Sequence, residues 1–202
     1  DCSDHEVNIK ILLNLALERG RLDGAGRNEL LASMTEEVSA LVLRSNYLQT
    51  QALSMMESLT HERLGADEHF ISMLDRQGVF DRDLEQLPDE EELRERVANG
   101  QGLTRPELSL LLSYGKITLY KDLIDSDVPE DPYLSRELED YFPAPLREQF
   151  SDLMSEHRLR REIIATKVTN SIVNRMGANF PMRLREDTGA NSAAIAKAYT
   201  VV

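Results

Sequence analysis

The chain has 202 residues, enough for one or two domains with a sizeable core, and 41% of them are hydrophobic while 29% are charged. The 36 acidic residues outnumber the 23 basic ones, and the net charge of −13 makes nucleic acid and anionic membranes poor partners. A single cysteine, Cys2, excludes an internal disulfide, and no stretch approaches the ~20 apolar residues of a membrane span. We therefore predict a soluble, cytoplasmic protein.

Helical periodicity is the main pattern in the first third of the chain. An apolar stripe at three- and four-residue spacing predicts a helix from Asp4 that ends at Gly20. A loop over residues 20–26 and a short helix from Asn28 are expected next. A long helix is predicted from Thr35 to about residue 59. The stripe that we expect it to turn into a core is Val38, Leu41, Val42, Leu48, Ala52, Met55, Met56 and Leu59.

The middle of the chain carries several helix signals. We predict a helix over residues 66–77, ended by Gly78, and a short acidic surface helix over residues 89–98. Thr104 and Glu107 form a capping box, with a proline inside the first turn. The apolar helix that follows is expected to be buried, and Gly115 in its middle suggests a close crossing by another helix.

Prolines mark the next breaks, at positions 129, 132, 143 and 145, around a helix over about residues 134–142. A long helix is predicted over residues 156–176 and a last one from Asn191. The sequence shows no convincing alternating strand and no fixed-period repeat, so we predict an all-α fold. The last helical pattern is still running, without a cap, where the chain stops, and the chain does not start with Met, so we expect a piece cut at both ends from a longer protein.

Few residues stand at spacings that predict catalysis or metal binding. His61-Glu62 begins like the zinc motif HExxH, but Gly65 stands where the second histidine belongs. The spacing of His61 and His69 is likewise unsuited to a shared metal, so we predict no metal site. The other two histidines are His5 and His157.

Two further patterns have plain structural interpretations. Gly24-Ala25-Gly26 precedes a helix, but it follows a helix rather than a strand, so the dinucleotide-binding fingerprint does not apply. The basic cluster of Arg158, Arg160 and Arg161 is interpreted as a salt-bridged or solvated helix face.

The opening segment, Asp1 to Glu6, concentrates reactive and titratable side chains. Its structural interpretation is a capping box, in which Ser3 caps the first helix and Glu6 closes the box. A helix start that carries a serine is also a ready anion site, because free amides and a hydroxyl can bind a carboxylate. Cys2 and His5 are too close in sequence to predict a thiol–imidazole pair.

Four separated blocks resemble a known family, in order and over almost the whole chain. They are CSDHEVNIKILLN at residues 2–14, TRPELSLLLSYGK at 104–116, LREQF at 146–150 and LRREIIATKVTNSIVNRMG at 159–177. These blocks are similar to the C-terminal part of the large bacterial NAD-specific glutamate dehydrogenases. The segment from Cys2 to Glu6 also resembles the Val-Ser-x-x-Glu segment of the smaller glutamate dehydrogenases, although Cys2 replaces the valine.

The resemblance implies an enzyme that oxidatively deaminates L-glutamate to 2-oxoglutarate and ammonium with NAD. In the smaller enzymes the serine of that segment helps to bind the side-chain carboxylate of glutamate, which implies a substrate-binding role for Ser3. The catalytic lysine and aspartate and the nucleotide-binding turn would lie upstream of this chain. The chain would then contain no catalytic residue and would not bind NAD by itself.

The domain division implied by the resemblance places closing helices of the catalytic region at residues 1–60 and a helical C-terminal domain at residues 61–202. The role expected for the chain is structural or assembly-related, packed against its own upstream catalytic domain in a homo-oligomer. The alternative is a free-standing helical interaction or regulatory module, which the acidic, helix-only composition would also fit.

Overall fold

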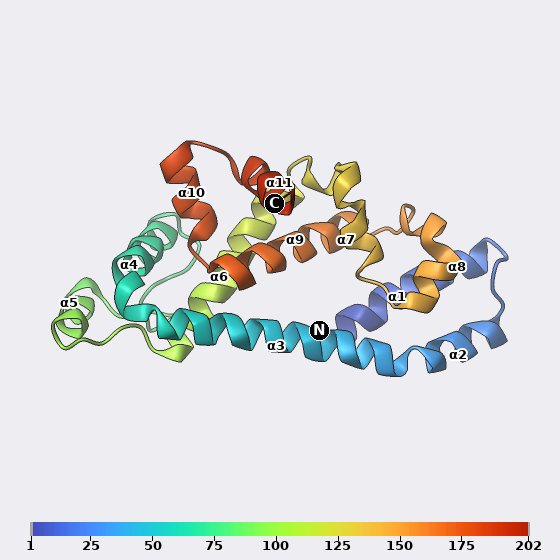
Figure 1. The fold of residues 1–202 in the computed structure, drawn as a ribbon, viewed down its shortest axis with the longest axis horizontal. Helices are drawn as coiled ribbons and strands as arrows, with labels where there is room; N and C mark the ends of the chain where they lie inside the picture. Colours follow the sequence, from blue (N-terminus) through green and yellow to red (C-terminus); the bar gives the residue numbers. More distant parts are fainter. Residues whose placement is uncertain (1, 202) are drawn as a thin grey trace. The chain divides into compact units, whose positions relative to one another are not determined.

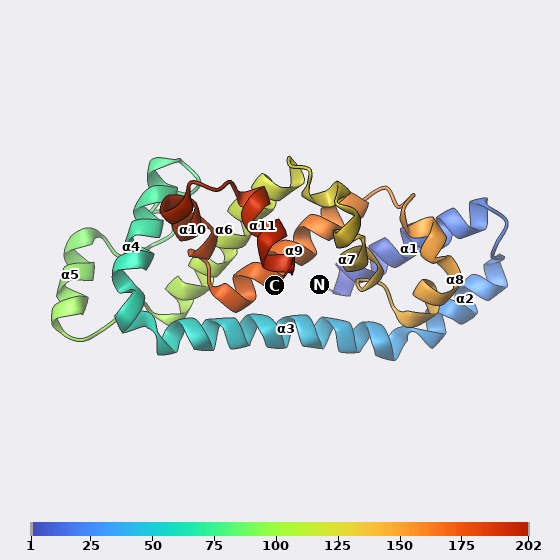
Figure 2. The same cartoon turned by 45° about the horizontal axis from the view of Figure 1, so that its top comes forward.

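A computed structural model describes residues 2–201, and over these residues the regular secondary structure is all helical, with no strands (Figures 1 and 2). The all-α prediction is confirmed. The helices are α1 (Cys2–Glu18), α2 (Gly24–Ser33), α3 (Thr35–Ser58), α4 (Thr60–Arg76), α5 (Glu90–Ala98), α6 (Arg105–Ile124), η1 (Val128–Glu130), η2 (Pro132–Leu134), α7 (Ser135–Glu139), α8 (Ala144–Met154), α9 (Arg160–Met176), α10 (Phe180–Thr188) and α11 (Ser192–Val201). Within this described part, no helix is long and apolar enough to cross a membrane.

The described chain divides into two compact units, each built from two separate segments. Unit 1 combines residues 2–48 with 123–168, and unit 2 combines residues 49–122 with 169–201. The boundaries fall inside α3, α6 and α9, so each of these long helices contributes one part to each unit.

Unit 1 is organised around α1, which packs against α8; Figures 1 and 2 show the two helices side by side. The predicted stripe of α1 is fully buried at Leu12, Leu13 and Ala16. Opposite it, α8 buries Leu146 and Phe150. The side chain of Glu37 in α3 accepts a hydrogen bond of 2.9 Å from the amide of Ala144, which caps the first turn of α8.

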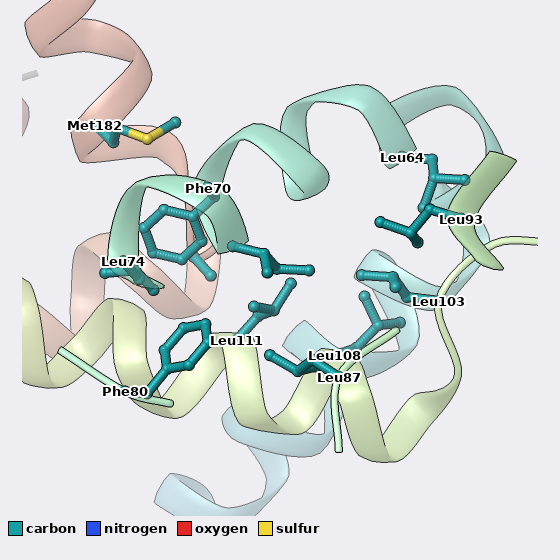
Figure 3. Packing of buried hydrophobic residues seen from close by; sticks show 12 residues of the cluster. Leu64, Phe70, Leu74, Phe80, Leu87, Leu93, Leu103, Leu108, Leu111 and Met182 are labelled. Atoms are coloured by element: carbon teal, nitrogen blue, oxygen red, sulfur yellow. The ribbon is translucent and has the colours of Figure 1, made fainter. Parts of the chain in front are cut away.

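Unit 2 surrounds a leucine-rich core that draws on α4, α5, α6 and α10 (Figure 3). Leu93 of the acidic surface helix reaches this core beside Leu64. The predicted acidic helix is confirmed as α5, and Asp89 caps it by accepting a hydrogen bond from the amide of Glu92 at 2.8 Å. In the predicted capping box, Glu107 accepts a hydrogen bond from the amide of Thr104 at 2.6 Å. Glu107 also forms an ion pair of 2.8 Å with Arg96, which ties α5 to the start of α6.

Two helices that the sequence did not predict, α8 and α10, each carry a proline near their start. Pro145 and Pro181 stand in their first turns, where a proline loses no intrahelical hydrogen bond, yet Pro145 was interpreted as a break. The predicted start of α9 at residue 156 is also wrong. The side chain of His157 accepts a hydrogen bond from the amide of Leu159 at 3.1 Å and holds a turn there, so the helix begins at Arg160.

Two other predicted starts are late by several residues. Helix α2 begins at Gly24 instead of Asn28, because Asp23 caps it by accepting a hydrogen bond of 2.7 Å from the amide of Gly26. Helix α4 begins at Thr60 instead of residue 66, and the Thr60 hydroxyl accepts a hydrogen bond of 2.8 Å from the amide of Leu103. Such a long-range contact has no signature in the local sequence.

The long helix α3 has the predicted span, but its apolar stripe is less covered than expected. Ala52 is the one buried residue of the stripe within the described chain. Leu48 is 37% exposed and Met55 is 57% exposed, so interpreting Met55 as a core residue is wrong, whereas Met56 packs against the unit 2 core. Periodicity shows which face of a helix is apolar, but not how much of that face a neighbour covers.

Gly115 supports the predicted close approach in α6. A Cβ atom there would stand 2.8 Å from the carbonyl oxygen and 3.0 Å from the Cα of Ala178, just beyond the end of α9. These are backbone atoms, so a methyl group could be accommodated only by shifting the chain. Gly65 in α4 is the contrasting case, because a Cβ there would meet nothing within 4 Å.

We predict opposite signs for alanine substitutions at these two glycines. Gly115→Ala should destabilise the protein by about 1–3 kcal/mol, because overpacking outweighs the gain in helix propensity. Gly65→Ala should stabilise it by up to about 1 kcal/mol. Urea unfolding followed by circular dichroism measures both, and a stabilising Gly115→Ala would contradict the close packing.

Candidate functional site

Ser3, the substrate-binding residue implied by the resemblance, lies in the first turn of α1 with its side chain exposed. The predicted capping box is wrong, because α1 begins at Cys2 and Ser3 is therefore inside the helix. Glu6 does not reach back to the helix start. Instead it forms an ion pair with Lys10, four residues further along, a spacing that favours such pairs on a helix surface.

A hydrogen-bonded cluster of Asp4, Asn8 and Tyr141 involves this first turn. The side-chain amide of Asn8 donates to the Tyr141 hydroxyl at 2.9 Å and to one carboxylate oxygen of Asp4 at 3.2 Å. The Tyr141 hydroxyl donates to the other carboxylate oxygen of Asp4 at 3.1 Å. Tyr141 is 7% exposed and comes from the segment between α7 and α8. Burial raises the pKa of Tyr141, so its hydroxyl keeps the proton that it donates.

Two histidines flank this cluster. The ring of His5 stacks on the ring of Tyr141 with 4.4 Å between centroids. His5 is thus placed against an aromatic ring, and the Cys2 side chain, with which no thiol–imidazole pair was predicted, lies outside the described residues. Burial lowers the pKa of His5, although the nearby Asp4 carboxylate opposes this shift.

His157 forms a hydrogen bond with the backbone of α1. Its Nε2 lies 3.1 Å from the carbonyl oxygen of Asn8, which can only accept, so this nitrogen carries the proton. Its Nδ1 accepts from the amide of Leu159, so the ring is neutral. Burial lowers the pKa of His157, which agrees with that neutral form.

Two arginines just beyond the C-terminal end of α1 attach it to the segment that includes α8. Arg19 forms an ion pair with Glu156, and Arg21 forms one with Asp152. Arg21 also donates to the carbonyl oxygen of Gln149 at 2.7 Å and lies over the ring of Phe150. Both ends of α1 are therefore attached to the segment that includes α8.

Unit 2 contains a second candidate site, a cavity of about 460 Å³ between α4, α6, α10 and the start of α11. On its wall, Asp122 accepts hydrogen bonds from Ser192 at 2.5 Å and from Arg185 at 3.3 Å. The apolar walls include Phe70 and Met182, both members of the unit 2 core. The cavity has room for a small molecule, and its Asp122 and Arg185 side chains form an ion pair with each other.

Asp67 is a buried acid near the N-terminus of α10. It is 5% exposed and accepts a hydrogen bond of 2.8 Å from the side chain of Asn179. Burial raises the pKa of Asp67 from 3.8 to about 6, although Arg63 and Asn179 oppose the shift. The sequence held a signal for this residue, because Asp67 lies on the same helical stripe as Leu64, Ile71 and Leu74.

The remaining patterns have structural roles. His69 pairs with Glu186 at 2.8 Å. In the part of the chain that the structure describes, no three His, Cys, Asp or Glu residues are grouped to hold a metal ion. Arg160 and Arg161 both pair with Glu130, as predicted for a salt-bridged face, and Arg161 also donates to the carbonyl oxygen of Ile124.

The described residues do not fit a nicotinamide dinucleotide. The glycine-rich turn of such a site joins a strand to a helix, whereas residues 2–201 include no strand. Gly24 and Gly26 belong to the first turn of α2, where Gly26 is already used by the Asp23 cap.

Residues 2–201 thus form an all-helical structure without a dinucleotide-binding fold. The hydrogen bonds that join Asn8 in its first helix to Tyr141 and His157 are called the polar anchor. The chain belongs to the family described as "Glutamate dehydrogenase, C-terminal", which matches residues 100–202. Residues 1–56 match a second family, described as the catalytic domain of bacterial NAD-glutamate dehydrogenase. These matches confirm the resemblance found in the sequence.

Three curated relatives carry the name NAD-specific glutamate dehydrogenase. The chain is 52% identical to the protein of Pseudomonas aeruginosa over 202 residues and 53% identical to that of Halomonas elongata over 201, in both cases covering the whole chain. It is 36% identical to the protein of Mycobacterium tuberculosis over 199 residues, or 98% of the chain. The chain spans 12% of the length of each of these relatives.

We predict that Asp67→Asn stabilises the protein above pH 6. The pKa of Asp67 is raised in the folded state, so the stability gained by its protonation is complete below pH 3.8 and is lost as the pH rises through about 6. At pH 8 the variant should be more stable by about 2–3 kcal/mol, and the difference should shrink toward pH 4.

Urea midpoints of both proteins between pH 4 and pH 8 test this dependence. Glu68→Gln removes the same charge from the same helix at a less buried position and should change stability by less than about 0.5 kcal/mol throughout. An Asp67→Asn effect that does not vary with pH would contradict a buried, titrating carboxylate.

Proposed function

We propose that this chain is part of an NAD-dependent glutamate dehydrogenase, which converts L-glutamate to 2-oxoglutarate and ammonium. The observation that carries the proposal is the 52% identity over the full chain to a relative of that name. Because the described residues do not fit NAD, the hydride transfer is assigned to residues outside this chain. We place the enzyme in the cytoplasm, as a homo-oligomer without nucleic acid or membrane partners.

The proposed role of the chain is to complete and support the catalytic region. Residues 1–60 are proposed to be closing helices of that region, and residues 61–202 a helical C-terminal domain. The match of residues 1–56 to a catalytic-domain family and of residues 100–202 to a C-terminal family supports this division. The chain itself is proposed to be inactive without its upstream catalytic domain.

Ser3 is the proposed substrate-binding residue, for the side-chain carboxylate of glutamate. Three observations support this role: its hydroxyl is exposed, it lies in the first turn of α1, and the positive end of the helix dipole favours an anion there. A serine hydroxyl can donate one hydrogen bond to a carboxylate oxygen while nearby backbone amides bind the other.

We predict that Ser3→Ala, in the protein expressed from its complete reading frame, raises the KM for glutamate about tenfold or more. A hydrogen bond to a charged group contributes an effect of this size to binding. The value of kcat should change little if the contact is equally strong in the ground state and the transition state. Initial rates of NADH formation measure both constants.

Ser39→Ala is the matched control, because the exposed Ser39 hydroxyl of α3 bonds only to the backbone of its own helix. Its KM for glutamate should stay at the wild-type value. An unchanged KM in Ser3→Ala would remove Ser3 from the substrate site. A complete protein with no glutamate-dependent activity would overturn the dehydrogenase proposal and favour a helical interaction or regulatory module.

A further inference from the structure

Tyr141 connects the two parts of the chain that match different families. It lies in the C-terminal match, 133 residues beyond its partner Asn8 in the catalytic-domain match. Its hydroxyl is the meeting point of the cluster, since it accepts from Asn8 and donates to Asp4. The C-terminal segment therefore reaches the first turn of α1 through a specific, buried side chain.

The cluster restrains Asp4 in particular. Both oxygens of this carboxylate are used, one by the Asn8 amide at 3.2 Å and the other by the Tyr141 hydroxyl at 3.1 Å. Asp4 directly follows Ser3, so fixing its side chain fixes the backbone turn that presents the Ser3 hydroxyl. Helix ends otherwise fray, and a frayed turn must be ordered again each time a ligand binds.

A second contact supports the same turn from the backbone side. His157, also in the C-terminal match, donates from Nε2 to the carbonyl oxygen of Asn8 at 3.1 Å. Asn8 is thus held through its side chain by Tyr141 and through its main chain by His157. The two contacts fix Asn8, one turn beyond Asp4, against both translation along the helix axis and rotation about it.

We propose that Tyr141 is a positioning residue for substrate binding: it holds the first turn of α1 so that Ser3 is pre-organised for the glutamate side-chain carboxylate. This role rests on the function proposed above for Ser3. Tyr141 is itself buried and acts through Asp4. Through Tyr141, the C-terminal segment contributes to the affinity for the substrate.

The test uses the complete enzyme with Tyr141→Phe, which keeps the ring that stacks on His5 and removes only the hydroxyl. The KM for glutamate should rise about threefold to tenfold, the effect of one hydrogen bond. The KM for NAD should stay close to the wild-type value. A general loss of structure would raise the KM for NAD as well, so the split between the two KM values identifies positioning.

Tyr199→Phe is the matched control. The Tyr199 hydroxyl is also partly buried and donates a hydrogen bond of 3.1 Å to the carbonyl oxygen of Ser171, but this contact lies within unit 2. Its KM for glutamate should not change. An equal rise in both variants would overturn the assignment of a specific role to Tyr141.

Asp4 provides an independent route to the same answer. Asp4→Ala removes the acceptor of the Tyr141 hydroxyl and should raise the KM for glutamate as Tyr141→Phe does. Asp4→Asn keeps an oxygen that can accept this hydrogen bond, but its NH2 group faces the donating Asn8 amide, so it should restore only part of the affinity. If alanine and asparagine at this position gave the same KM, the positioning role would be wrong, even if Tyr141→Phe failed to fold.

A double-variant cycle separates this inference from the proposed function. If Tyr141 acts through Ser3, the double variant Ser3→Ala/Tyr141→Phe should bind glutamate no more weakly than Ser3→Ala alone. Fully multiplicative effects would overturn the inference and leave the Ser3 assignment intact. No effect of Ser3→Ala by itself would overturn the Ser3 assignment, and the inference with it.

Discussion

The attachment of α1 to the segment 123–168 is the interaction on which the rest of unit 1 depends. The apolar stripe of α1 supplies the burial, with Leu12 and Leu13 fully covered against α8, but apolar packing alone leaves the rotation and depth of a helix loosely defined. The hydrogen bonds that join Asn8 to Tyr141 and His157 specify both, because they have fixed lengths and directions. Burial of the apolar stripe keeps α1 packed against α8, and the polar anchor determines the rotation and depth of α1.

Residues from the beginning and from the later part of the sequence belong to one compact unit. The helices that match a catalytic-domain family do not form a compact unit by themselves, because their buried faces are completed by residues more than a hundred positions later. The ion pairs of Arg19 and Arg21 and the cap that Glu37 provides for α8 repeat the same connection at other points. Within unit 1, the segment 123–168 therefore completes the packing of residues 2–48.

Local signals predicted a large part of the fold. The capping box of Thr104 and Glu107 acts within one helical turn, so the start of α6 could be recognised directly from the sequence. Helix α8 was missed because Pro145 was interpreted as a break, whereas a proline in the first turn of a helix is well tolerated. The starts of α4 and α9 involve a long-range or side-chain contact that short-range periodicity does not contain.

Less of the candidate site could be predicted from the sequence. Ser3 was suggested by a resemblance over a short segment, and no pattern marked Asn8 or Tyr141. The contact between these two side chains joins positions 133 residues apart, and neither residue stands at a motif spacing. Asp67 was the exception, since an acid on an apolar helical stripe is a visible anomaly whose burial could have been expected.

Amide hydrogen exchange in α1 of the complete protein tests the polar anchor most directly, when wild type is compared with Asn8→Ala. Alanine has the higher helix propensity, so local preference alone would slow exchange in this helix. The anchor predicts the reverse: faster exchange over residues 3–13, with exchange in α4 of unit 2 unchanged. Equal or slower exchange over residues 3–13 in Asn8→Ala would contradict the account.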